Sequence, residues 1–200
     1  MRIHQHGIML QKTWTVQEQS DTAVTYEYNG TVGDFETFPF ACHLEVTYRL
    51  EGRKLVAEFK VKNTGGADLW FQMGGHPGIN LPDWKEENAV DGYLRLEGTP
   101  KSLLRAGDQG CLEPERVPVP LTEDGLVPLT VETFANEALI FDDHQISAAT
   151  MLGLNRQPVA RVESNAHVRP FWSPTDVHSP FVCVEPESGP CDPPPFTCHI

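Results

Sequence analysis

Residues 43–63, HLEVTYRLEGRKLVAEFKVKN, constrain the fold more than any other part of the sequence. Apolar and polar side chains alternate here on both sides of the dipeptide Glu51-Gly52. Because successive side chains of a strand point to opposite faces, this pattern predicts two antiparallel strands that turn near Glu51-Gly52 and bury one face. The side chains predicted to be buried are Leu44, Val46, Tyr48, Leu55, Ala57, Phe59 and Val61.

Short strand candidates recur along the rest of the chain, in the segments DGYLRLEG, QISAATML, VARVESN and PFVCVEP. AVTYEYNGTV contains an Asn-Gly step and is predicted to be another strand end or a tight turn. One helix is predicted, over VETFANEALIF (residues 131–141), and GCLEPERVPVPLTEDGLVP is predicted to be an extended loop because prolines interrupt it. Many short strands separated by turn residues indicate an all-β sandwich or barrel. The length of 200 residues is typical of one domain, so we expect residues 1–200 to form a single domain.

Composition narrows the class of protein. The net charge is -13, with 28 acidic against 15 basic residues, and the sequence has no basic stripe of the kind that binds nucleic acid. No segment resembles a signal peptide or an apolar membrane span. The five cysteines are scattered rather than spaced as a disulfide framework. We therefore expect a soluble cytoplasmic protein with reduced thiols that binds neither nucleic acid nor membranes.

Three residues are candidates for chemistry. His6 lies in HQHGI and His76 in GGHPG, where the neighbouring glycines allow the backbone to turn closely around the imidazole. Glu185 ends the apolar stretch SPFVCVEP, and apolar surroundings raise the pKa of a carboxyl group toward the range useful for proton transfer. A non-catalytic interpretation stays open for each residue. A single histidine is usually structural or exposed, and Glu185 can be the first solvated residue after a buried strand.

Metal binding is not expected from the sequence. Cys191, Cys198 and His199 have the spacing C-x6-C-H, which matches no zinc pattern. His4 and His6 would share one side of a strand, but no carboxylate partner can be chosen for them. The sequence also has no glycine-rich phosphate loop, no GxSxG and no HExxH motif.

The segments HGIMLQKTW, FQMGGHPGIN and PFVCVEPESGPCD occur in this order, and together they resemble the three signature segments of the aldose 1-epimerase (galactose mutarotase-like) family. The resemblance covers most of residues 6–192 and includes the alternating segment at residues 43–63. It implies a large antiparallel β-sandwich, called a supersandwich. Family members are longer, so the resemblance also implies a sandwich that is incomplete at both ends.

The resemblance further implies a reaction, the interconversion of the α and β anomers of a free hexose such as glucose or galactose. Glu185 corresponds to the general base that takes the C1 hydroxyl proton, and His76 to the general acid that protonates the ring oxygen. His6 corresponds to the second histidine, which holds the ring-oxygen side of the sugar. Opening a hemiacetal needs an acid and a base but moves no electrons to a cofactor, so no cofactor or metal is expected.

Two positions differ from the family pattern: Leu10 stands where an arginine is usual, and Glu187 where a tryptophan is usual. These differences keep two alternatives open, a non-catalytic sugar-binding derivative and a truncated fragment of the same fold. A sugar-phosphate epimerase is less favoured because arginines are sparse near the motifs. The expected protein partner is a second copy of this chain, in a homodimer that covers exposed sheet edges.

Overall fold

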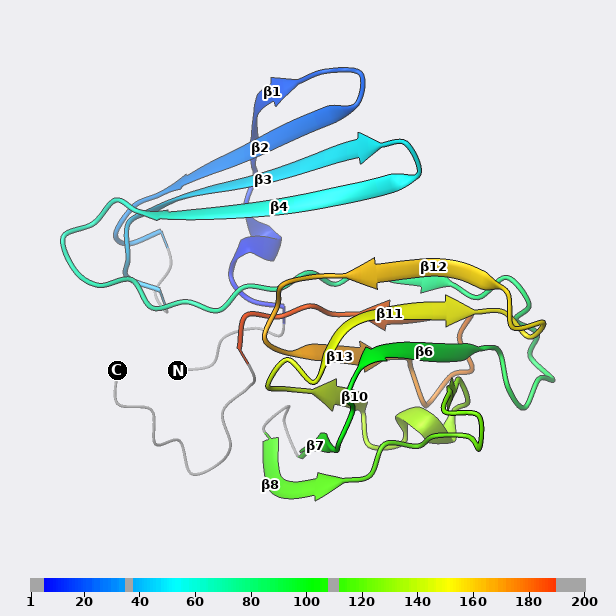
Figure 1. The fold of residues 1–200 in the computed structure, drawn as a ribbon. Coiled ribbons are helices and arrows are strands. Elements are labelled where there is room, and N and C mark those ends of the chain that lie inside the picture. Colours follow the sequence, from blue (N-terminus) through cyan, green and yellow to red (C-terminus); the bar gives the residue numbers. More distant parts are fainter. Residues whose placement is uncertain (1–5, 35–37, 108–111, 190–200) are drawn as a thin grey trace. The chain divides into compact units, whose positions relative to one another are not determined.

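The computed structural model describes residues 6–34, 38–107 and 112–189 of the chain (Figure 1). The chain divides into two compact units, Met1–Phe71 (unit 1) and Gln72–Ile200 (unit 2). Strands dominate both units, and the helical elements of the described residues are 3₁₀ turns, η1 (Met9–Gln11) and η3 (Glu132–Phe134). A single domain over residues 1–200 stays a prediction, since one domain can contain two such units.

Unit 1 contains one antiparallel sheet in which neighbouring strands follow the chain order, drawn in blue to cyan in Figure 1. The strands are β1 (Thr15–Gln19), β2 (Ala23–Gly30), β3 (Cys42–Glu51) and β4 (Lys54–Asn63). The hairpin predicted at residues 43–63 is confirmed: β3 and β4 pair from Cys42 with Asn63 to Glu51 with Lys54, and Gly52 and Arg53 form the turn.

The predicted burial of one hairpin face is wrong. The register does place Leu44 opposite Val61 and Val46 opposite Phe59, so the apolar side chains share a face as expected. None of the predicted set is buried, however, and Tyr48 and Leu55 are 40% and 66% exposed. Alternation decides which side chains share a face, but burial requires a second layer over that face. Among the described residues of unit 1, just Gly30 and Cys42 are buried.

The hairpin turn depends on Gly52, whose φ is +62°. Gly52→Ala is expected to destabilise the β3–β4 hairpin by about 1 to 2 kcal/mol, because an L-residue resists this backbone conformation. The cost is purely conformational, since a Cβ added at Gly52 would meet no atom within 4 Å. Amide hydrogen exchange of β3 and β4 measures the effect. Gly52→Asn is the control and should lose less; equal losses would contradict this explanation.

Unit 2 contains two antiparallel sheets. The six-stranded sheet has the order β5 (Gly78–Asn80), β14 (Phe181–Val184), β13 (Arg169–Trp172), β10 (Ala138–Phe141), β7 (Leu103–Ala106) and β8 (Leu112–Val117). The four-stranded sheet has the order β12 (Pro158–Glu163), β11 (Ile146–Leu152), β6 (Tyr93–Gly98) and β9 (Val127–Pro128).

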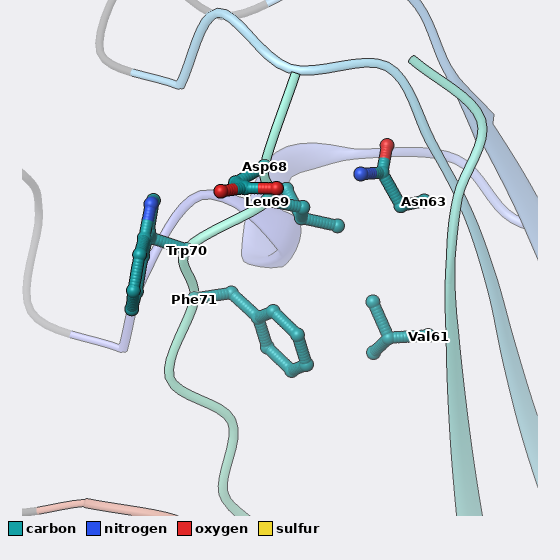
Figure 2. Close-up of a pocket in the computed structure, with 6 residues that line it drawn as sticks. All are labelled: Val61, Asn63, Asp68, Leu69, Trp70 and Phe71. Atoms are coloured by element: carbon teal, nitrogen blue, oxygen red, sulfur yellow. The ribbon is translucent and has the colours of Figure 1, made fainter. Parts of the chain in front are cut away.

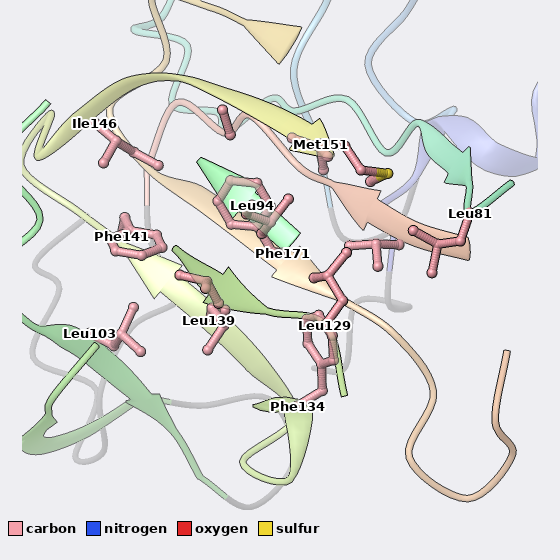
Figure 3. Close-up of a cluster of buried hydrophobic side chains, with 14 residues drawn as sticks. Leu81, Leu94, Leu103, Leu129, Phe134, Leu139, Phe141, Ile146, Met151 and Phe171 are labelled. Atoms are coloured by element: carbon pink, nitrogen blue, oxygen red, sulfur yellow. The ribbon is translucent and has the colours of Figure 1, made fainter. Parts of the chain in front are cut away.

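Both sheets of unit 2 contribute to one hydrophobic core (Figure 3). Leu94 and Met151 come from the four-stranded sheet, whereas Phe141 and Phe171 come from the six-stranded sheet. The rings of Phe141 and Phe171 meet edge to face, with centroids 5.9 Å apart. Two antiparallel sheets that bury a shared core form a β-sandwich, as the sequence predicts.

The strands predicted from DGYLRLEG, QISAATML, VARVESN and PFVCVEP are confirmed as β6, β11, β12 and β14. The strand end predicted in AVTYEYNGTV is confirmed as well, since β2 ends at Gly30. The helix predicted at residues 131–141 is wrong, because one 3₁₀ turn is followed by strand β10. Glu137, with φ +70°, interrupts the helical path. The loop predicted at residues 110–128 is also wrong in part, since it contains β8 and β9. Prolines such as Pro114 did not prevent β8, which is an outer strand.

Cys42 and Cys183 are buried and free. Cys111, Cys191, Cys198, His4 and His199 lie outside the described residues, so the sequence-based interpretation of these positions stays untested. None of the described helices is long and apolar enough to span a membrane.

Candidate active site

The site forms where residues 74–78 run beside β14 and its continuation. In this antiparallel pair, Cys183 lies opposite Gly78, and an isolated bridge pairs Glu187 with Gly74. Between these two points the chains are tied by hydrogen bonds of 3.0 Å, from the Val184 amide to the Pro77 carbonyl and from the Gly75 amide to the Pro186 carbonyl. From Gly78 to Gly74 one segment advances residue by residue against the other from Cys183 to Glu187, without a bulge. This register places His76 directly opposite Glu185.

The two side chains meet as the register requires. His76 Nε2 lies 3.2 Å from Glu185 Oε1. The side chain of Glu185 is 13% exposed and that of His76 is 40% exposed, so the carboxylate is sheltered while the imidazole is accessible to solvent. The His76 ring also meets Trp172 of β13 edge to face, with centroids 6.4 Å apart. The Glu185 amide donates to the Pro170 carbonyl at 2.8 Å, which fixes the backbone behind the carboxylate.

The sequence predicts that His6, His76 and Glu185 converge on one site. The structure brings His76 and Glu185 together within unit 2. His6 belongs to unit 1, where it and Gly7 have φ values of 68° and 74°. The chain therefore turns sharply at His6-Gly7, as its glycine suggested, and the convergence of His6 with the other two residues stays a prediction.

Cys183 is a site residue that sequence reasoning missed. Cys183 lies two positions before Glu185, and Glu187 lies two positions after Glu185. The three side chains therefore share one face of an extended chain. The residues opposite Cys183 and Glu187 are glycines, which leaves space for both side chains. A Cβ on Gly74 would come within 2.9 Å of Glu187 Cγ, so a side chain there would displace Glu187. The alternation in VCVEPE was the signal that could have identified Cys183.

Burial changes the proton affinity of two groups in this row. Burial raises the pKa of Glu187 to about 7, and the negative charge of Glu185 adds to the effect. The same two causes, in the same order, raise the pKa of the Cys183 thiol to about 11. Near neutral pH, Glu187 therefore exchanges a proton readily, whereas the thiol of Cys183 stays protonated.

The raised pKa of Glu187 has a measurable effect on stability. The folded pKa is about 7 and the ordinary value is 4.5, so the folded protein binds more protons than the unfolded protein between these pH values. The contribution of Glu187 to the stability of the wild type should therefore fall as the pH rises from 4.5 to 7. Glu187→Gln cannot titrate, and it is expected to be more stable than the wild type by roughly 1 to 3 kcal/mol at pH 8 and equal to it at pH 4.

Urea unfolding at several pH values tests this expectation. Glu123→Gln is the matched control, because Glu123 is an exposed glutamate of the same unit. A stabilisation of Glu187→Gln that is the same at pH 4 and pH 8 would show that the cause is not the titration of Glu187.

Three atoms that can bind a metal lie together in the site. They belong to His76, Cys183 and Glu185, and all lie within 4.8 Å of one another. These three residues come from two segments that are distant in the sequence, whereas candidate ligands such as His4 and His6 are neighbours in the chain.

Two other features of the structure contain none of the predicted catalytic residues. A cavity of about 360 Å³ in unit 1 is lined by Val61, Asn63, Asp68, Leu69, Trp70 and Phe71 (Figure 2). In unit 2, His178 Nε2 lies 2.5 Å from Asp91 Oδ2, and its Nδ1 lies 3.1 Å from the carbonyl oxygen of Glu86. Both ring nitrogens of His178 are therefore engaged, and this histidine connects two loops instead of offering a base.

The β-sandwich thus presents an imidazole next to a carboxylate just after the end of β14, and these are two groups of the kind that general acid–base chemistry uses. The chain belongs to the aldose 1-epimerase family, whose sequence model matches residues 2–192.

The curated relatives include the plasmid LacX protein of Lactococcus lactis subsp. lactis, which is 25% identical over 195 residues. This alignment covers 94% of the present chain and 64% of LacX. The chromosomal LacX protein of the same organism is 24% identical, with the same coverage. The chain thus spans less than two thirds of the length of the curated relatives it matches.

Solved structures show the same fold. A galactose mutarotase-like protein from Lactobacillus casei is 27% identical with a TM-score of 0.84, and the match covers 95% of this chain and 66% of that protein. A galactose mutarotase related enzyme from Lactobacillus acidophilus is 23% identical with a TM-score of 0.82, covering 98% and 65%. The galactose mutarotase-like β-sandwich expected from the sequence is therefore confirmed.

Proposed function

We propose that this protein is an aldose 1-epimerase, which interconverts the α and β anomers of a free hexose such as glucose or galactose. The observation that carries the proposal is the pairing of His76 with Glu185, with Nε2 and Oε1 3.2 Å apart on neighbouring segments held in register. Membership of the aldose 1-epimerase family supports a sugar substrate.

The proposed reaction needs one base and one acid on the two sides of a single C–O bond. Glu185 accepts the proton of the C1 hydroxyl while His76 gives a proton to the ring oxygen. The C1–O5 bond breaks with its electron pair going to O5, and C1 becomes an aldehyde carbon. Rotation about the C1–C2 bond presents the other face of the aldehyde, and the two proton transfers then run in reverse as the ring closes.

The surroundings of the pair suit these roles. Glu185 is sheltered, which limits its solvation by water, and its backbone is fixed by the hydrogen bond to Pro170. His76 is more exposed, and a histidine is able to give and take protons near neutral pH. In the absence of sugar the two groups contact each other, and the substrate would enter between them. His6 is proposed as the second histidine, which holds the ring-oxygen side of the sugar.

A second candidate function is sugar binding without turnover. The observations that favour it are Glu187, which places a second carboxyl beside Glu185, and Leu10, which is 69% exposed where the family pattern has an arginine. A single carboxylate base next to another acidic group works less well if both compete for one proton.

We further propose a cytoplasmic location, which the two buried free cysteines support. The homodimer stays a prediction.

Polarimetry on freshly dissolved α-glucose and α-galactose tests the proposal. The expected result is a rate of mutarotation above that of a protein-free buffer blank, because the reaction also proceeds spontaneously. If the rate equals the blank while calorimetry detects sugar binding, the sugar-binding function replaces the enzyme. If neither activity nor binding is found, the alternative of a truncated fragment is favoured.

A further inference from the structure

Three side chains of the candidate active site offer three kinds of metal-binding atom. His76 offers an imidazole nitrogen, Cys183 a sulfur and Glu185 a carboxylate oxygen, and these atoms lie within 4.8 Å of one another. Nothing in the proposed epimerase reaction uses Cys183, although it is 4% exposed and faces the reacting pair.

We propose that His76, Cys183 and Glu185 form a binding site for a divalent cation of the Zn²⁺ type, and that the bound cation inhibits the protein. The binding part of this proposal stands on the three ligands alone. The inhibition part rests on the proposed epimerase function.

The ligand set matches the chemistry of zinc. Zinc accepts nitrogen, sulfur and oxygen ligands, and sites with three protein ligands keep a fourth position open for water or another molecule. With metal–ligand distances of 2.0–2.3 Å, tetrahedral ligands lie about 3.3 to 3.8 Å from each other. His76 Nε2 and Glu185 Oε1 are already 3.2 Å apart. The other two separations are at most 4.8 Å, so side-chain rotations that shorten them by roughly 1 Å would bring all three atoms to tetrahedral spacing.

The fold holds these ligands in place without a metal. Cys183 and Glu185 are two residues apart on one extended chain, so their side chains point to the same side. His76 stands opposite Glu185 in the antiparallel register, and Gly78, opposite Cys183, contributes no side chain to fill the space. Because His76 is 40% exposed, a hydrated ion can reach the site from its side. On binding, the thiol of Cys183 releases its proton to solvent and its sulfur bonds to the metal as a thiolate.

Inhibition follows from the position of the ligands. The metal would occupy the imidazole nitrogen that donates the proton and the carboxylate oxygen that accepts it. Neither transfer can then occur, and the space between the two groups is filled. Zinc should therefore compete with the sugar, and a chelator should restore activity.

Binding is tested with the full chain after dialysis against a chelator, using Zn²⁺ in calorimetry and Co²⁺ in absorption spectroscopy. We expect Co²⁺ to produce a thiolate-to-metal charge-transfer band, which Zn²⁺ abolishes by displacement. Cys183→Ser should lose this band and bind Zn²⁺ at least roughly tenfold more weakly. Cys42→Ser is the matched control, because Cys42 is the other buried free cysteine, and it should keep both the band and the affinity.

His76→Asn provides a second variant that does not depend on replacing a buried residue, and it should also lose at least roughly tenfold in Zn²⁺ affinity. The proposal is overturned if the wild type gives no thiolate band, or if the band and the affinity persist in Cys183→Ser. Binding is measured without sugar, so its outcome is separate from that of the polarimetry. Zinc binding without any turnover would support the metal site and reject the epimerase function together with its inhibition.

Discussion

Glu185→Gln is expected to slow enzymatic mutarotation by about 10² to 10⁴-fold while leaving sugar affinity nearly unchanged. Glutamine keeps the size of the side chain and one acceptor oxygen, but it cannot take the proton of the C1 hydroxyl. The loss should therefore appear in kcat and not in KM. Polarimetry above the buffer blank measures the rate, and calorimetry measures the affinity.

His76→Asn should cause a loss of similar size, because without the acid the ring oxygen would have to leave as an alkoxide. The double variant should be little slower than either single variant, since both residues serve one transition state. Glu123→Gln, a change of the same type at an exposed site, should keep full activity. A Glu185→Gln protein with wild-type kcat would show that the base is another group.

Phe171→Ala is expected to destabilise unit 2 by about 3 to 5 kcal/mol. Phe171 has no exposed surface, and its ring contacts Phe141 at the centre of the core (Figure 3). Its removal exchanges dispersion contacts for a cavity between two sheets that cannot easily close. A loss of this size is a large part of the total stability of a typical domain, about 5 to 15 kcal/mol, so partial unfolding at 37 °C is expected.

Urea unfolding followed by circular dichroism measures the change. Phe71→Ala is the matched control, because Phe71 is 48% exposed and its truncation should cost less than about 1 kcal/mol. Phe171 also pairs with Val184, the residue before Glu185, so the folded fraction of Phe171→Ala should show a weakened site. Equal losses in the two variants would contradict the assignment of the core.

The strands were predictable where a local pattern sets them. Alternation was sufficient in residues 43–63 and in the segment of β6, because a period of two is a property of the strand itself. The segments of β11 and β14 were identified as short apolar runs bounded by turn residues. Residues 131–141 were not predictable in this way. Their alanines and glutamates favour a helix, but the short apolar run of β10 pairs with β13 and β7, and these contacts are distant in the sequence. Burial of the hairpin face failed for a similar reason, since it depends on what covers the sheet.

The sequence marked two residues of the candidate site but not their arrangement. The motifs GGHPG and PFVCVEP marked His76 and Glu185, yet nothing local reveals that these segments pair. Once the register is known, Cys183 and Glu187 enter the site as the next side chains on the same face. The raised pKa of Glu187 comes from burial in the folded protein, which no pattern along the chain records.

The position of β5 gives the site a dynamic character. β5 has three residues and is the outer strand of its sheet as described, so it is held by β14 on one side. Outer strands fray and re-form far more often than a whole domain unfolds. His76 precedes β5, and residues 73–77 are tied to residues 184–188 by backbone hydrogen bonds of their own, so fraying of β5 alone would loosen one flank of the histidine–glutamate pair. An opening of the whole edge from residue 73 to Asn80 would separate the pair, and the fraction of time spent closed would then scale both the proposed catalysis and the apparent affinity for any ligand that needs the pair.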